Sequence, residues 1–257
     1  MEVFFSPDAW IALLTLTFLE IVLGIDNIIF ISIATGKLPA EQRKKATKVG
    51  MFLAMFMRIG LLLGISYLIA MKEPWFSIDF SWFNAQISGQ SIILLLGGLF
   101  LIYKSTNEIR EKVENKGGEE KELSKAAAKS FQSVILQIIM IDLVFSFDSI
   151  LTAVGMTNGI HGALYIMITA VVISVLIMMQ FAVPVGNFVN KHPSIQILGL
   201  SFLILIGFML LTESAHLSNA LIFGNHVTPV PKGYLYFAIS FSLLVEVLNM
   251  KAAKKKN

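Results

Sequence analysis

Four carboxylates lie within apolar stretches of this sequence, in two copies of one short pattern. In each copy two acids are six residues apart, and a small polar residue follows the second acid. The residues are Glu20, Asp26 and Asn27 in the first copy and Asp142, Asp148 and Ser149 in the second. An ionised side chain at the centre of a membrane-spanning helix costs about 2.5–3.5 kcal/mol. These residues are therefore expected to have a function inside the membrane.

The donor atoms of these residues favour one class of metal. Carboxylate, amide and hydroxyl oxygens suit Mn²⁺, Mg²⁺ or Ca²⁺. The chain has no Cys, and its four His fall in predicted loops or at the ends of predicted spans, which argues against Zn²⁺ or Cu⁺. Arg58 is the one basic residue inside a predicted span, and we expect it to be a structural counter-ion to one acid. Four acids against one base leave a deficit of positive charge, which protons or a bound cation would fill.

The composition excludes a soluble protein. Of the 257 residues, 56% are apolar and 14% are charged, whereas a soluble domain carries about 25% charged residues. The net charge of +3 is too small to indicate nucleic-acid binding. We therefore predict an all-α polytopic membrane protein that is surrounded by the lipid bilayer and has no covalent cofactor.

A helix needs about 20 apolar residues to span a bilayer. Seven apolar stretches of this sequence have about that length. They run approximately over Trp10–Ala34, Val49–Met71, Ser88–Tyr103, Ser133–Met156, Ala163–Val189, Ile195–Thr212 and Tyr234–Met250. Of the 20 lysines and arginines, 17 fall on one side of this arrangement. Because basic residues mark the cytoplasmic side, we expect the N-terminus outside and the C-terminus in the cytoplasm. A bacterial inner or plasma membrane fits this distribution.

The two copies of the acidic pattern divide the chain. Three spans separate the copies, so they cross the membrane in opposite directions, as in the inverted repeats of many secondary transporters. We predict a first three-helix repeat (1–106), a cytoplasmic connector (107–130), a second three-helix repeat (131–213), and an outer loop, seventh helix and basic tail (214–257). The connector is expected to form two short helical pieces, and the loop with Trp75 and Trp82 to anchor at the membrane surface.

The inverted repeat predicts where the acids lie. Since the two copies are antiparallel, Glu20 is expected at the depth of Asp148, and Asp26 at the depth of Asp142. Two acids six residues apart lie about 9 Å apart along a helix and do not share a face. Either each acid faces a different neighbour, or the helix is broken between them, at Gly24 in the first copy and at the corresponding serine in the second.

These motifs resemble a known family. The segments EIVLGIDNIIFISI and DLVFSFDSILTAVGMT are similar to the two signature segments of the TerC family of integral membrane proteins, and Arg58-Ile-Gly also resembles the family pattern. That family was named for tellurium resistance and is placed with the lysine-exporter superfamily. The resemblance implies two three-helix repeats with one extra helix, and a role in manganese export or metal homeostasis. It points to all six residues of the repeated pattern as metal-binding.

These observations favour a divalent cation exporter, with Mn²⁺ as the expected ion and Ca²⁺ or Mg²⁺ as alternatives. Export would proceed by alternating access at the acidic site, with protons as the counter-substrate. The alternative is an accessory membrane protein that assists metallation or insertion of exported proteins, and a homo-oligomer or membrane-protein partners fit either function. We do not expect an enzyme, because the Gly-x-Gly-Asp segment of intramembrane aspartyl proteases is missing at both Asp26 and Asp148.

Overall fold

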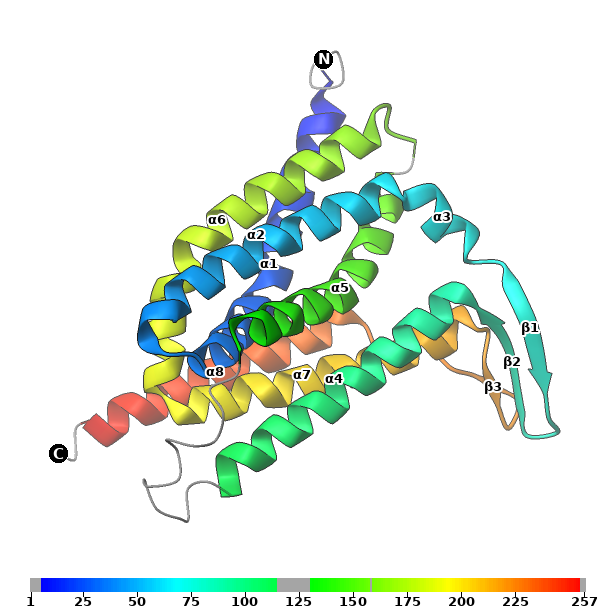
Figure 1. The fold of residues 1–257 in the computed structure, drawn as a ribbon. Coiled ribbons are helices and arrows are strands. Elements are labelled where there is room, and N and C mark those ends of the chain that lie inside the picture. Colours follow the sequence, from blue (N-terminus) through cyan, green and yellow to red (C-terminus); the bar gives the residue numbers. More distant parts are fainter. Residues whose placement is uncertain (1–5, 115–129, 158, 255–257) are drawn as a thin grey trace. The chain divides into compact units, whose positions relative to one another are not determined.

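The computed structural model describes residues 6–114, 130–157 and 159–254, and only the backbone at Ile25, Asp26, Ala253 and Lys254. Within these ranges it contains eight helices (Figure 1). They are α1 (Pro7–Gly36), α2 (Ala40–Leu63), α3 (Ile65–Ala70), α4 (Gly89–Glu114), α5 (Phe131–Met156), α6 (Ala163–Lys191), α7 (Pro193–Leu217) and α8 (Lys232–Lys254). In this part of the chain, seven of them are long and apolar enough to cross a membrane. The prediction of an all-α protein with seven spanning helices is confirmed, whereas the inverted relation of the repeats stays a prediction.

Local sequence signals explain several helix ends. The side chain of Ser6 accepts a hydrogen bond from the amide of Ala9 at 3.3 Å and so caps α1, with Pro7 in its first turn. Pro193 occupies the corresponding position of α7. The third span is longer than expected, because α4 continues to Glu114. The rest of the predicted connector, residues 115–129, lies outside the described residues.

Helices α1 and α5 run without a break through both copies of the acidic pattern. A break at Gly24 is therefore wrong. This glycine instead makes room for a neighbour, since a Cβ at its position would lie 2.0 Å from the sulfur of Met178 on α6. The corresponding Ser146 is also helical, and its hydroxyl donates back to the carbonyl of Asp142 at 2.6 Å.

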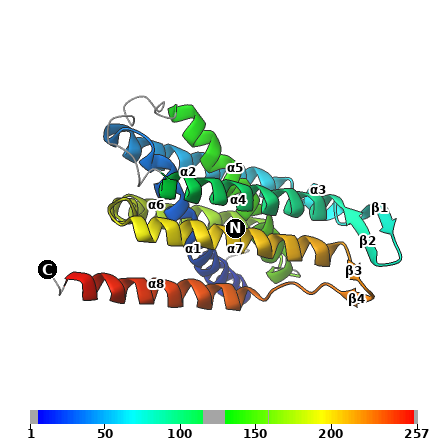
Figure 2. The same cartoon turned by 90° about the horizontal axis from the view of Figure 1, so that it is seen from below.

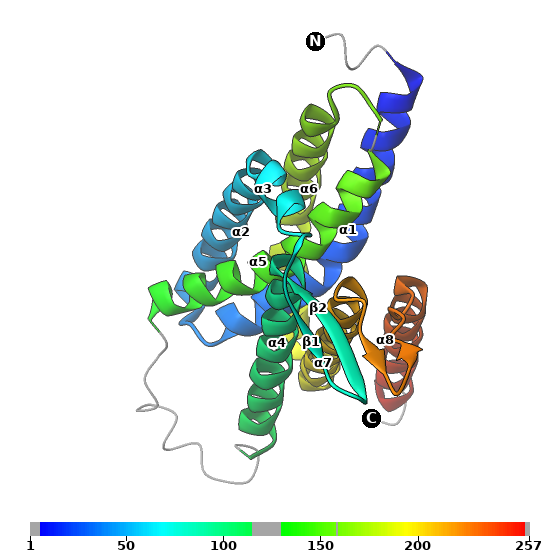
Figure 3. The same ribbon diagram turned by 90° about the vertical axis from the view of Figure 1, so that its right-hand side faces the viewer.

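Four long helices, α1, α2, α5 and α6, form one compact unit, which also contains all but the last residue of the short α3. Helix α1 packs along α6 and α2 along α5, as Figures 1 and 3 show. Small residues allow the close approach, because a Cβ at Gly50 would lie 2.9 Å from Ile138 and one at Gly186 2.9 Å from the hydroxyl of Ser32. We call this part the four-helix unit. Its helices come from both predicted repeats, so the compact units do not follow the repeat boundaries.

Helices α4, α7 and α8 belong to a second compact unit, in which α7 packs against both α4 and α8 (Figure 2). Gly98 and Gly207 face each other there: a Cβ on Gly98 would lie 2.7 Å from the carbonyl oxygen of Gly207. The hydroxyl of Ser214 on α7 donates to the main-chain carbonyl of Ser91 on α4 at 2.7 Å. Contact between backbones therefore holds this pair of helices together.

The second unit also carries a small antiparallel sheet, which the sequence analysis treated only as a membrane-anchoring loop. Its strands are β1 (Pro74–Asp79), β2 (Phe83–Ser88), β3 (Leu221–Ile222) and β4 (Asn225–His226), in the order β1-β2-β3-β4. A two-residue turn joins β3 to β4 through Phe223 and Gly224, both with positive φ. Trp75 and Trp82 are exposed on this sheet. Whether they anchor it at a membrane surface stays a prediction.

Candidate functional site

The four-helix unit contains a buried ion-pair cluster centred on Arg58 of α2. The guanidinium donates through Nε and Nη2 to the two carboxylate oxygens of Asp142 on α5, at 3.0 and 2.5 Å. Its Nη1 donates to Oε2 of Glu20 on α1 at 2.5 Å. The side chains of Arg58, Glu20 and Asp142 are 5%, 7% and 8% exposed. One cation thus ties together three helices. We call these three residues the Arg58 cluster.

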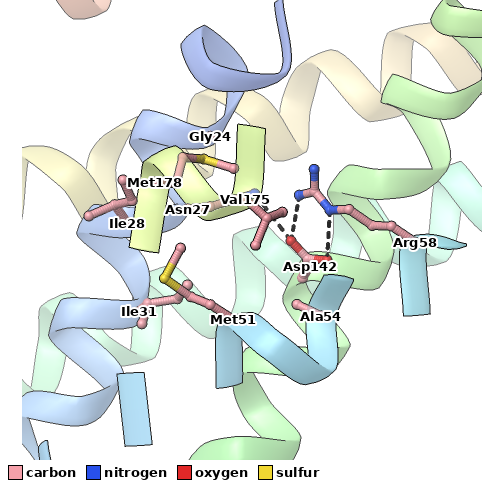
Figure 4. Close-up of a pocket in the computed structure, with 10 residues that line it drawn as sticks. All are labelled: Gly24, Asn27, Ile28, Ile31, Met51, Ala54, Arg58, Asp142, Val175 and Met178. Carbon is pink, nitrogen blue, oxygen red and sulfur yellow. Dashed lines mark hydrogen bonds and ion pairs between the residues drawn. The ribbon is translucent and has the colours of Figure 1, made fainter. Parts of the chain in front are cut away.

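Two further polar side chains surround Asp142. The amide nitrogen of Asn27 on α1 donates to its Oδ1 at 3.4 Å, and the hydroxyl of Ser146 lies 3.1 Å from its Oδ2. Figure 4 shows Asn27 and Arg58 converging on this carboxylate. The amide oxygen of Asn27 is buried and accepts no hydrogen bond from any described residue. Among the described residues, this oxygen is therefore available as a metal ligand beside the Arg58 cluster.

A small hollow lies next to these groups (Figure 4). Its volume is about 20 Å³, which suffices for one water-sized particle. Asn27, Arg58 and Asp142 form its polar wall, and Met51 and Met178 are among the apolar residues that close it. A bare cation or a single water fits there, whereas a larger organic substrate does not.

The contacts of the acids cut across the two predicted layers. Glu20 was expected at the depth of Asp148, and Asp26 at the depth of Asp142, but Glu20 and Asp142 bind the same guanidinium. The physical reason is the shortage of positive charge. Arg58 is a buried cation with a planar fork of donors, so it draws an acid from each of α1 and α5 to itself. It is the counter-ion of two acids, not of one.

The other predicted site residues have different surroundings. The side chain of Asp26 lies outside what the structure describes. Asp148 is half-buried, one and a half turns beyond Asp142 on α5. The hydroxyl of Ser149 is buried and donates to the main-chain carbonyl of Ser146 at 3.3 Å. Among the described side chains, no three His, Cys, Asp or Glu residues lie close enough together to hold a metal ion.

Ser146 and Met178 are the neighbours of the cluster that sequence reasoning missed. Ser146 was considered only as a point of helix unwinding. Its spacing of four residues from Asp142 could have identified it, because a serine hydroxyl in a helix reaches back to the preceding turn. Met178 lines the hollow beside Asp142, and the sequence gives no signal for that position. Its approach to Gly24 depends on the pairing of α1 with α6, which no local pattern reveals.

Comparison with known proteins places this chain among related membrane proteins. The profile of the "Integral membrane protein TerC family" matches residues 5–257. UPF0053 inner membrane protein YgdQ of Escherichia coli (strain K12) is 49% identical over 250 residues, which are 97% of this chain and 96% of the relative.

Two further relatives differ in length. A UPF0053 protein of Haemophilus influenzae is 44% identical over 246 residues, or 96% of this chain and 95% of its own. UPF0053 inner membrane protein YoaE of Escherichia coli (strain K12) is 44% identical over 255 residues, which are 99% of this chain but 45% of YoaE. No solved structure matches the chain.

Proposed function

This chain belongs to the TerC family of integral membrane proteins, and we propose that it transports a divalent cation across the membrane through the Arg58 cluster. One observation carries the proposal: the cluster is buried among apolar helices and holds two carboxylates but one guanidinium. With both carboxylates ionised, the three side chains carry one net negative charge. Ionisable residues within membrane helices mark ion pathways far more often than they serve packing alone.

The available donors define the class of ion. Carboxylate oxygens of Glu20 and Asp142 and the free amide oxygen of Asn27 are hard ligands, which favour Mn²⁺, Mg²⁺ or Ca²⁺. Asp26, Asp148 and Ser149 belong to the same proposal as ligands at another stage of the cycle. Resemblance to the manganese-linked TerC segments favours Mn²⁺ among these ions.

Protons are the proposed counter-substrate, with alternating access as the mechanism. A carboxylate that takes up a proton loses most of its attraction for a metal, so proton binding from one side would release the cation there. The names of two relatives, YgdQ and YoaE, describe inner membrane proteins, which supports the same location here. The distribution of lysine and arginine supports a C-terminus in the cytoplasm. Export as the direction rests on the resemblance to the TerC family.

A second candidate function is that of an accessory protein for exported proteins. The sheet of the second unit favours it, because Trp75, Trp82 and Phe223 are all more than half exposed there. Exposed aromatic groups of this kind suit binding of another protein. Capture of such partners without any ion flux would identify this function.

Flux through proteoliposomes tests the transport proposal. Purified protein would be reconstituted and Mn²⁺ entry followed with a trapped fluorescent chelator, with Mg²⁺, Ca²⁺ and Zn²⁺ as competitors. Glu20→Gln and Asp142→Asn are each expected to reduce the flux at least about 100-fold. The matched control is Asp79→Asn, which alters an exposed acid of β1 and should leave flux unchanged. Unaltered flux in both cluster variants would contradict the site, and absence of flux for every cation would contradict transport.

A further inference from the structure

The hollows of the four-helix unit follow one another along α1. One, of about 420 Å³, is lined by Asp8 and Thr15 near the start of α1 and by Ile160 of the loop before α6. A second, of about 10 Å³, lies beside Glu20, and Leu16 lines both. The third is the hollow beside Asn27. These positions succeed each other along the helix, so the hollows form a series that leads from the end of the unit to the Arg58 cluster.

Arg58 stands at the boundary between the second and third hollows. Glu20 lines the second hollow, whereas Arg58 and Asp142 line the third. The guanidinium bonds to both acids, so its hydrogen bonds close the series at this point. Arg58 thus links a residue of the second hollow, Glu20, with residues of the third.

A cation that binds both acids competes with Arg58 for the same oxygens. All three carboxylate oxygens that face each other across the cluster already accept a guanidinium N–H. A metal at bonding distance from one of these oxygens, about 2.0–2.6 Å, would lie about 4 Å from a guanidinium nitrogen. At that separation the repulsion of a divalent ion exceeds thermal energy about tenfold, even at the effective dielectric constant of a protein. Binding of an ion through these three oxygens is therefore favoured when the guanidinium is displaced.

We propose that Arg58 is a tethered competitor, which occupies the acid pair when no ion is bound and admits only cations with at least two charges. A monovalent ion carries the same charge as the guanidinium but lacks its fork of donors, so it gains nothing by the exchange. A divalent ion offers twice the attraction. This inference rests on the proposed function, since it concerns the same two acids, and it assigns Arg58 a specificity role beyond that of a structural counter-ion.

Mn²⁺ titration of purified full-length protein in nanodiscs tests this role. In Arg58→Ala the acids lose their competitor, so Mn²⁺ should bind at least about tenfold more tightly than in wild type. Na⁺ at about 100 mM should then weaken Mn²⁺ binding several-fold in the variant and not in wild type, with choline chloride as the ionic-strength control. Free guanidinium at low millimolar concentration should compete in the same variant, because it restores the missing group.

Two further variants keep the test decisive. Arg58→Lys retains the charge without the fork, so its Mn²⁺ affinity should rise by about threefold, and this variant carries the test if Arg58→Ala does not fold. Arg110→Ala, at an exposed arginine that pairs with Glu114 on α4, should match wild type. Unchanged or weaker Mn²⁺ binding in folded Arg58 variants, with binding intact in wild type, would overturn the competitor role alone. Absence of Mn²⁺ binding in wild type and variants alike would overturn the proposed function as well.

Discussion

Each compact unit contains an arginine paired with a carboxylate, and the two differ mainly in their surroundings. Arg58 contacts Asp142 and Glu20 with 5% of its side chain exposed, whereas Arg110 contacts Glu114 with 72% exposed. The exposed pair joins residues four apart on one helix and is screened by solvent. The buried group joins three helices and has more acid than base. The excess negative charge of the Arg58 cluster therefore calls for a functional explanation, whereas the exposed pair of Arg110 and Glu114 does not.

The helices of the two units are also held together differently. In the four-helix unit, the ion pairs of Arg58 and the close approach of helices at glycines both hold the helices together. Between α4 and α7, Gly98 and Gly207 bring the two backbones together, and a buried serine adds one hydrogen bond. Lys112 of α4 also donates to the side-chain amide oxygen of Gln196 on α7, and we assign these contacts to stability. The four-helix unit is therefore where a change of charge should matter for transport.

The largest expected difference between the units concerns the two arginines themselves. Arg58→Met leaves two buried carboxylates without their cation, so the free energy of unfolding should fall by about 3–5 kcal/mol. Arg110→Met should leave the melting temperature unchanged, because its pair is exposed. Unfolding in detergent without divalent ions measures both. Similar small effects at the two positions would remove the distinction between them.

A smaller loss of stability is expected from the glycine contact of the second unit. Gly98→Ala places a methyl group 2.7 Å from the carbonyl oxygen of Gly207, which should lower the free energy of unfolding by about 1–3 kcal/mol. Mn²⁺ affinity should not change, because the acids lie in the four-helix unit. Gly155→Ala is the matched control, since open space surrounds that position on α5. A stable Gly98→Ala variant, or one with altered Mn²⁺ affinity, would contradict this division of roles.

Ser146→Ala is expected to have the smallest effect. Loss of the hydroxyl beside Asp142 removes one buried hydrogen bond, worth about 1 kcal/mol. The carboxylate would then be held less firmly, and Mn²⁺ affinity should fall by about two- to fivefold. Ser201→Ala, at an exposed hydroxyl of α7, should change neither quantity. Thermal unfolding and Mn²⁺ titration of the two variants would show whether Ser146 contributes to ion binding.

Much of the fold could be predicted from the sequence because the signals involved are local. Apolar length alone predicts seven spanning helices, and TM-length helices appear at each predicted place. The pairing of β2 with β3 could not be predicted, because Leu221–Ile222 pairs with residues more than 130 positions earlier in the chain. The local hairpin of β1 and β2 was missed because its exposed aromatic residues were interpreted as a membrane anchor. The sequence leaves open whether α1 continues through Gly24, since a glycine that makes room for Met178 looks the same in sequence as one that breaks a helix.

The residues of the site could be predicted from the sequence, but the contacts among their side chains could not. Glu20, Asp142 and Arg58 were all identified, because an ionisable residue is conspicuous in an apolar span. Their common contact could not be predicted, since it depends on how α1, α2 and α5 pack together. The antiparallel argument considered only the depths of the acids. It left out Arg58, whose attraction for two acids decides which of them meet.

Direct measurement of Mn²⁺ binding tests the central claim, that the Arg58 cluster holds a divalent cation. Free Mn²⁺ gives a strong electron paramagnetic resonance signal that disappears on binding, so titration of the purified protein counts the bound ions. We predict saturable binding by wild type and its loss in Glu20→Gln/Asp142→Asn, with Asp79→Asn behaving as wild type. Saturable binding that persists in the folded double variant would contradict the claim.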